Sequence, residues 1–204
     1  MKLLRIGVLG GTFDPIHSAH LMLAERMAGY LELDKVLFVP TGRPPHKDES
    51  KVAGARHRVE MVRLAIEGNP RFELSTIESD SAELSYTYRT LARLRERCGA
   101  GAELYYIVGS DVLEGLRDFK NFADICGECV FAAALRPGSS EARASECAEG
   151  LASRYGARIV MVPFIEIGIS STVIRDIIAN GGSARYLLPD SVLAYIAANR
   201  LFEA

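Results

Sequence analysis

The chain alternates short apolar segments with longer segments in which apolar residues recur at helical spacing. Six apolar segments predict strands, and most are uninterrupted, as expected when helices cover both faces of a parallel sheet. The alternation therefore predicts an α/β fold built on a doubly wound, mostly parallel sheet. The predicted strands span residues 3–9, 35–40, 72–78, 103–109, 129–135 and 158–163.

Helical patterns lie between these strands and after the last one. The pattern over residues 55–68 stops at Gly68-Asn69-Pro70, a strong helix terminator. Its apolar positions are Val59, Val62, Leu64 and Ile66. Two further helices are predicted over 87–97, with Leu91 and Leu94 among charges, and over 140–155. A C-terminal helical part is predicted at about 170–204, with one helix capped by Ser170 or Ser171 and ended by Gly181, and another that starts at Pro189.

The length and charge of the chain limit its class. A chain of 204 residues suits a single domain, residues 1–204, and its 49% hydrophobic residues can fill a sizeable core. The net charge of -2 argues against a surface that coats nucleic acid. No apolar run reaches the roughly 18 residues of a membrane span. We therefore expect neither nucleic acid nor a membrane as a partner.

Four cysteines without a regular framework are typical of a reducing compartment, and the N-terminal residues do not resemble a signal peptide. We therefore expect a cytoplasmic protein. Cys126 and Cys129 form one C-x-x-C pair, which suits a redox pair or half of a zinc site. The alternative is a cysteine at a helix end followed by one that opens a buried strand. No second pair has zinc spacing, which favours this structural interpretation.

The segment from Gly10 to His20 carries the most specific pattern. It follows a predicted strand and contains Gly10-Gly11, an Asp14-Pro15 bend and His17-x-x-His20 at the start of a helical pattern. A turn without side chains lets backbone N–H groups approach an anion, and a helix N-terminus attracts negative charge. Two imidazoles three residues apart share one helix face. The pattern predicts a nucleotide phosphate site; the alternative is an ordinary turn with exposed histidines.

Two phosphate-binding motifs are absent from the chain. It has neither G-x-G-x-x-G nor a phosphate loop that ends in Gly-Lys-Ser/Thr. The first absence argues against an NAD-binding dehydrogenase.

His17-Ser18-Ala19-His20 closely resembles the H/T-x-G-H signature of the nucleotidyltransferase superfamily, with Ala19 in place of glycine. The preceding Gly10–Pro15 resembles nicotinate-nucleotide adenylyltransferases in particular, and Ile169–Arg175 resembles the family motif I-S-S-T-x-I-R. The resemblance runs from Ile6 to Leu201. It implies a Rossmann-like nucleotidyltransferase fold and a step of NAD biosynthesis, in which ATP and nicotinate mononucleotide give nicotinate adenine dinucleotide and pyrophosphate.

The resemblance also implies roles for individual residues. His17 and His20 would donate hydrogen bonds to the phosphates, while Lys47 and Arg175 would hold the polyphosphate. Mg²⁺ would enter with ATP and keep several waters, so no metal ligands are expected from the protein. The remaining residues implied at the phosphates are Gly10, Gly11, Thr12, Phe13, His46, Ser170, Ser171 and Thr172.

For the second substrate, the resemblance implies that the turn at Thr87 and Tyr88 meets the nicotinate carboxylate. Other residues implied at the nucleotides are Gly109, Asp111, Phe119 (where relatives have tryptophan), Lys120 (where they have an aromatic residue) and Arg136. The alternatives are helix caps at residues 85–88 and at Asp111, and a solvated Lys120.

The same motifs also allow other functions. The acceptor could instead be nicotinamide mononucleotide or pantetheine phosphate, the transfer could be of a cytidylyl group, or the chain could sense nucleotides without catalysis. The sequence leaves open a monomer or a homodimer.

Overall fold

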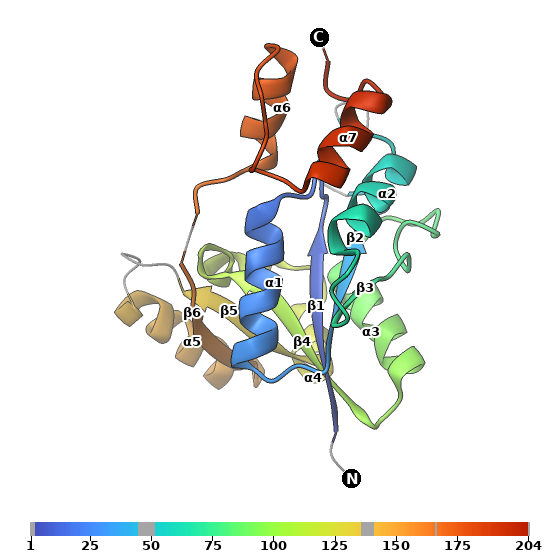
Figure 1. The fold of residues 1–204 in the computed structure, drawn as a ribbon. Helices are drawn as coiled ribbons and strands as arrows, with labels where there is room; N and C mark the ends of the chain where they lie inside the picture. Colours follow the sequence, from blue (N-terminus) through green and yellow to red (C-terminus); the bar gives the residue numbers. More distant parts are fainter. Residues whose placement is uncertain (1–2, 45–51, 136–140, 166, 204) are drawn as a thin grey trace. The chain divides into compact units, whose positions relative to one another are not determined.

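The computed structural model describes residues 3–44, 52–135, 141–165 and 167–203, and it confirms the α/β prediction (Figure 1). Six strands form one sheet in the spatial order third, second, first, fourth, fifth, sixth. This order places the first strand at the centre, as in other doubly wound sheets. The strands are β1 (Leu4–Gly11), β2 (Lys35–Pro40), β3 (Phe72–Leu74), β4 (Ala102–Gly109), β5 (Cys129–Leu135) and β6 (Arg158–Pro163).

The helices follow the predicted alternation, with one addition. A 3₁₀ segment and a short helix stand between β4 and β5, where the sequence analysis gave helices only as alternatives, one capped by Asp111 and one that ends at Cys126. The helices are α1 (Ser18–Tyr30), α2 (Ala55–Ile66), α3 (Thr87–Cys98), η2 (Ser110–Asp118), α4 (Phe122–Glu128), α5 (Glu141–Tyr155), α6 (Ser171–Ala179) and α7 (Asp190–Ala198). No helix among these described residues is long and apolar enough to cross a membrane.

Strand pairing explains the uninterrupted apolar runs. The pairs β1–β4, β4–β5 and β5–β6 are all parallel. All residues of β5 except Leu135 are buried, whereas in β6, at the edge of the sheet, only Val162 is buried. Parallel strands need crossover helices, and right-handed crossovers that leave β1 in opposite directions place helices on opposite faces. Figure 1 shows α1 in front of the strands and α4 behind them.

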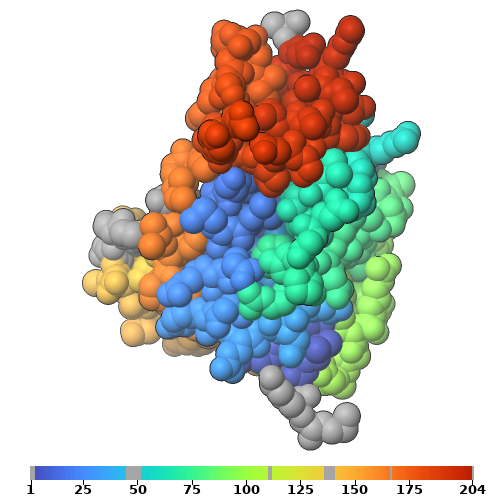
Figure 2. Space-filling view, in the orientation of Figure 1, coloured from blue at the N-terminus to red at the C-terminus, as the bar shows by residue number. Residues whose placement is uncertain are grey.

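Contacts between Cα atoms divide the chain into two compact units. Unit 1 comprises Met1–Leu9, Leu23–Leu37 and Ser85–Glu166, and its core includes Met27, Leu104, Ile125 and Phe131. Unit 2 comprises Gly10–Met22, Phe38–Leu84 and Ile167–Ala204, and its core includes Phe13, Phe38, Met61, Ile174 and Val192. Within unit 2, α7 packs against α2, and the two helices form adjacent surface in Figure 2. The single-domain organisation stays a prediction.

One strand and the buried face of one helix differ clearly from the sequence prediction. The strand predicted over 72–78 is only three residues long, because Thr76 and Asp80 close a turn. The Asp80 N–H donates to the Thr76 carbonyl at 2.9 Å, and the Thr76 hydroxyl donates to the Asp80 carboxylate at 2.6 Å. In α2, the buried face is Arg58, Met61, Val62 and Ile66, so the predicted apolar positions Val59 and Leu64 are only half-buried.

Candidate active site

The Gly10-Gly11 pair belongs to β1 and is not the predicted glycine turn. The Gly11 carbonyl accepts a hydrogen bond from the Thr41 N–H at 2.9 Å, which keeps the backbone extended. Phe13, not a glycine, takes the left-handed conformation, with φ +50°. A Cβ at Gly11 would lie 3.0 Å from the buried Phe13 ring. Gly11 therefore makes room for the Phe13 ring. The prediction that the glycine pair forms a turn open to an anion is wrong.

The two histidines lie together at the start of α1, as predicted. His17 immediately precedes the helix and His20 is in its first turn. Their rings stack, with centroids 3.7 Å apart and planes inclined by 27°. The edge of the Phe13 ring packs against His20 at 5.1 Å between centroids. His17 is buried and His20 half-buried, so the alternative of two exposed histidines is wrong.

Burial sets the charge of this pair. Loss of water lowers the pKa of His17 to about 4. Burial and the neighbouring His17 lower the pKa of His20 to about 3. Both imidazoles are therefore neutral at pH 7. The backbone N–H of His17 donates to the His20 Nδ1 at 3.3 Å, so this ring nitrogen is an acceptor. The proton of neutral His20 is therefore on Nε2.

The His17 Nδ1 is buried without a hydrogen-bond partner among the described residues. A buried polar atom left in this state costs about 1–3 kcal/mol. The fold tolerates that cost at the most specific motif of the sequence, and groups of this kind call for a functional explanation.

The serine-rich motif packs on the turn that precedes His17. Ser170 is the N-cap of α6, as expected, and accepts from the Val173 N–H at 3.2 Å. The Ser171 hydroxyl donates to the Pro15 carbonyl at 2.9 Å. Arg175 donates to the Asp14 carbonyl at 2.7 Å and lies 3.7 Å from the Asp14 carboxylate. The two predicted phosphate motifs therefore meet within unit 2, through direct contacts.

Arg58 was missed by the sequence analysis. This side chain is 2% exposed and donates to four backbone carbonyls of the loops beside the histidine turn. The distances are 2.9 Å to Thr12, 2.6 Å to Thr41, 3.1 Å to Gly42 and 2.9 Å to Ala53. An arginine on the buried face of an amphipathic helix was the available signal, because arginine is rarely buried unless paired.

Thr87 and Tyr88 lie at the start of α3 in unit 1, among further aromatic and cationic groups. The Lys120 ammonium stands 4.6 Å from the centroid of the Tyr86 ring. Arg89 donates to the Tyr88 hydroxyl at 2.9 Å. The N-cap residue of α3 is Tyr86, with no capping side chain, so the predicted Ser or Thr cap is wrong.

The structure gives less information about the other predicted site residues. Gly109 ends β4 and is the N-cap of η2, so Asp111 lies inside that 3₁₀ segment and is not its cap. Phe119 is half-buried at the C-terminal end of η2. The predictions for His46, Lys47 and Arg136 fall outside the described residues.

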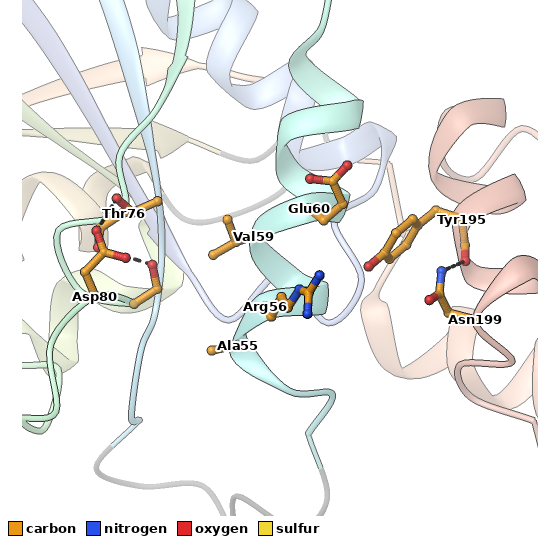
Figure 3. A pocket seen from close by; sticks show the side chains of 9 residues that line it. Ala55, Arg56, Val59, Glu60, Thr76, Asp80, Tyr195 and Asn199 are labelled. Carbon is orange, nitrogen blue, oxygen red and sulfur yellow. Dashed lines mark hydrogen bonds between the residues drawn. The ribbon is translucent and has the colours of Figure 1, made fainter.

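A cavity of about 680 Å³ lies elsewhere in unit 2, between α2, the turn after β3, and α7 (Figure 3). It contains none of the residues that the sequence predicted for a site. Its lining includes Arg56, Glu60, Asp80, Tyr195 and Asn199, and the Asn199 amide is bonded to the Tyr195 carbonyl.

Cys126 and Cys129 occupy the positions that the structural interpretation gives them, near the end of α4 and at the start of β5. Both are buried as free thiols. Burial raises the pKa of each, to about 12 for Cys129. A thiol with a raised pKa is a poor nucleophile and a poor metal ligand near pH 7.

Comparison with known proteins agrees with the motifs. The cytidylyltransferase-like family model matches residues 8–177. The probable nicotinate-nucleotide adenylyltransferase of Thermoanaerobacter sp. is 42% identical over 200 residues, which is 98% of this chain and 95% of that protein. That of Moorella thermoacetica is 40% identical, over 97% of this chain and 91% of the relative. The chain belongs to the nicotinate-nucleotide adenylyltransferase family.

Two solved structures of a related enzyme have the same fold as this chain. The nicotinic acid mononucleotide adenylyltransferase of Plasmodium falciparum complexed with NaAD superposes with a TM-score of 0.79, at 18% identity and 97% coverage of both chains. The complex of that enzyme with APC gives a TM-score of 0.77, covering 97% of this chain and 96% of the other. The Rossmann-like nucleotidyltransferase fold predicted from the motifs is thereby confirmed.

Within the adenylyltransferase, the predicted residues fall into two groups. Unit 2 holds the glycine pair, the histidines, and the start of α6 with Arg175. Unit 1 holds Thr87, Tyr88, Gly109, Phe119 and Lys120.

Proposed function

We propose that this chain transfers the adenylyl group of ATP to nicotinate mononucleotide, giving nicotinate adenine dinucleotide and pyrophosphate, a step in NAD biosynthesis. The observation that carries the proposal is the contact between the two motifs. The stacked His17 and His20 follow a turn that Ser171 and Arg175 hold through the carbonyls of Pro15 and Asp14.

The reaction requires little covalent chemistry from the protein. An oxygen of the 5′-phosphate of nicotinate mononucleotide, already ionised at pH 7, attacks the α-phosphorus of ATP. The new O–P bond forms as the bond between the α-phosphorus and the bridging oxygen breaks, and pyrophosphate leaves with that electron pair. No proton has to be removed from the nucleophile, so positioning and charge stabilisation suffice for catalysis.

We assign hydrogen-bond donation to the histidines. Neutral His20 carries its proton on Nε2, because its Nδ1 accepts from the His17 backbone. One neutral N–H can then bond a phosphate oxygen as charge moves toward the leaving group, without the desolvation cost of a buried imidazolium. Arg175 and the predicted Lys47 would supply the positive charges, and Gly10, Gly11, Thr12, Phe13, Ser170 and Thr172 the nearby backbone and hydroxyl groups.

The nicotinate moiety would bind in unit 1, at the start of α3. Thr87 and Tyr88 offer backbone N–H groups of a helix N-terminus, which suits a carboxylate. Lys120 adds a cation near Tyr86, and Phe119 offers a ring for stacking. Asp111, Gly109 and Arg136 remain the predicted contacts of the nucleotide.

Mg²⁺ would arrive as Mg-ATP and would neutralise the departing pyrophosphate. The described residues contain no group of three side chains that could hold a metal ion. The carboxylate of Asp14 already accepts from the Ala53 N–H at 3.1 Å and lies near Arg175. We keep the cytoplasm as the predicted compartment, and a monomer or homodimer as the predicted state.

Pyrophosphate release tests the proposal. The protein is incubated with Mg-ATP and, in separate reactions, with nicotinate mononucleotide, nicotinamide mononucleotide or pantetheine phosphate. We expect release to be fastest with nicotinate mononucleotide and to stop when EDTA removes Mg²⁺. Faster release with another acceptor would reassign the substrate, and ATP binding without release from any acceptor would indicate a nucleotide sensor.

A further inference from the structure

The four hydrogen bonds of Arg58 join three separate segments of unit 2. They reach Thr12 after β1, Thr41 and Gly42 after β2, and Ala53 before α2. Every acceptor is a backbone carbonyl, so the contacts fix the main chain and not side chains. Burial lowers the pKa of the guanidinium, whereas Asp14 and Glu78 oppose that shift. Arginine stays charged in proteins, so these bonds are charge-assisted.

Arg58 and Thr41 together orient two successive peptide planes. The Gly11 carbonyl points at the Thr41 N–H, and the Thr12 carbonyl points at the Arg58 guanidinium. In a trans peptide, the carbonyl and the following N–H point in opposite directions. The N–H groups of Thr12 and Phe13 are therefore turned away from Thr41 and Arg58.

The conformation of Phe13 needs such restraint. A left-handed φ of +50° is unusual for a bulky residue and persists only where the surroundings enforce it. Two guanidinium groups hold the carbonyls on either side of it: Arg58 holds Thr12, and Arg175 holds Asp14. The same residue packs its ring edge against His20. Arg58 thus acts, through Thr12 and Phe13, on the placement of the histidine turn.

We propose that Arg58 is a positioning residue for nucleotide binding: it orients the Gly11–Phe13 backbone so that the N–H group of Phe13 faces the phosphates of ATP. The inference rests on the proposed function, because it takes this backbone as part of the phosphate site. Because Arg58 is 2% exposed, the proposal gives it no direct contact with either substrate. Only an arginine has enough donors in one plane for four carbonyls, since a lysine ammonium has three.

The test compares Arg58→Lys and Arg58→Met with a matched control. Arg95 in unit 1 also donates to two backbone carbonyls, those of Ala102 and Glu128, at 2.5 Å and 2.6 Å. Arg95→Lys and Arg95→Met therefore remove bonds of the same kind away from the phosphate motifs. For each protein, the Kd of Mg-ATP is measured by calorimetry, kcat by pyrophosphate release, and Tm by scanning calorimetry, with Kd and kcat taken well below Tm.

We expect Arg58→Met to weaken Mg-ATP binding at least fivefold and to lower kcat at least tenfold, with Arg58→Lys recovering part of both losses. The Arg95 variants should lose a similar amount of Tm while Kd and kcat stay within twofold of the parent. If Arg58→Met does not fold, Arg58→Lys decides, with an expected loss of threefold or more in Kd.

Two results would overturn the inference. One is a folded Arg58→Lys or Arg58→Met protein whose Kd and kcat both match the parent within twofold. The other is an equal loss of Mg-ATP affinity in the Arg95 variants, which would mean that general destabilisation is the cause. If the parent binds Mg-ATP but releases no pyrophosphate, the proposed function fails and the Kd comparison still decides the role of Arg58.

Discussion

The imidazole of His17 stacks on that of His20, with ring centroids 3.7 Å apart. At this distance, two positive rings would repel each other, and burial disfavours either charge. In the proposed site, the pair would therefore meet the phosphates as two neutral donors, and catalysis would use its hydrogen-bond capacity, not its net charge.

Replacing His17 should lower turnover more than substrate affinity. A donor used mainly in the transition state contributes roughly 3–4 kcal/mol, so His17→Ala should lower kcat by about 10² or more while changing the KM of ATP only a few-fold. His57→Ala is the matched control. His57 lies in the first turn of α2, where its Nδ1 is 2.9 Å from the Tyr195 hydroxyl, and it has no role in the proposed reaction. Its kcat should change little. Near-normal kcat in His17→Ala would remove the proposed role.

Stability should fall as the pH falls below the ordinary pKa of histidine. His17 and His20 have folded-state pKa values of about 4 and 3, below the value of 6.5, so the unfolded chain binds more protons between these limits. Each histidine then removes up to about 1.4 kcal/mol per pH unit as the pH drops from 6.5 toward its folded-state pKa. Urea unfolding at pH 7.5, 6 and 5 measures this.

The matched variant for that experiment is His17→Asn, with His57→Asn as control. We expect a shallower pH dependence of the unfolding free energy in His17→Asn and an unchanged one in the control. Equal slopes in all three proteins would contradict the burial of a neutral His17.

Two glycines should respond in opposite ways to alanine. At Gly42, a Cβ would lie 2.2 Å from the Glu78 carbonyl oxygen, so the backbone must shift. We expect Gly42→Ala to destabilise by roughly 2–3 kcal/mol. Gly150, inside α5, meets nothing within 4 Å, and Gly150→Ala should stabilise by roughly 0.5–1 kcal/mol. Denaturant midpoints check both, and a tolerated Gly42→Ala would refute the close packing.

Lys120 should favour the acid form of the pyridine nucleotide. The side chain is exposed, and exposed charge pairs contribute about 0.2–1 kcal/mol. Lys120→Ala should therefore reduce the ratio of kcat/KM for nicotinate over nicotinamide mononucleotide by roughly 1.4- to fivefold. Arg117→Ala, also exposed and in the same segment, should leave the ratio unchanged. An unchanged ratio in Lys120→Ala would mean that this lysine is merely solvated.

Hydrophobic patterning predicted the strands and most helices because a buried parallel sheet demands uninterrupted apolar runs. β2, β5 and β6 have the predicted bounds. The pattern failed where a side-chain hydrogen bond decided the backbone, as at Thr76 and Asp80. The pattern also gave the wrong buried face for α2, because the charged Arg58 is one of its buried residues.

The candidate site was predicted by motif, but its internal contacts were not. Sequence could pair His17 with His20, since helical spacing fixes which residues are neighbours. It could not show that Arg58, 46 positions away from Thr12, would reach that residue, because this depends on how α2 and the loop after β1 meet in space. The left-handed conformation of Phe13 was equally hidden, since such a conformation usually favours glycine and Gly11 lies only two positions before it.

Because the Arg58 guanidinium recognises only main-chain oxygens, the side chains at Thr12, Thr41 and Ala53 take no part in its grip. Saturation mutagenesis should find Thr41 and Ala53 permissive to replacements that keep the local backbone, while site 58 admits almost no alternative. The loops of the proposed phosphate site could thus diverge in sequence, and with it in substrate preference, without losing the backbone contacts that shape them.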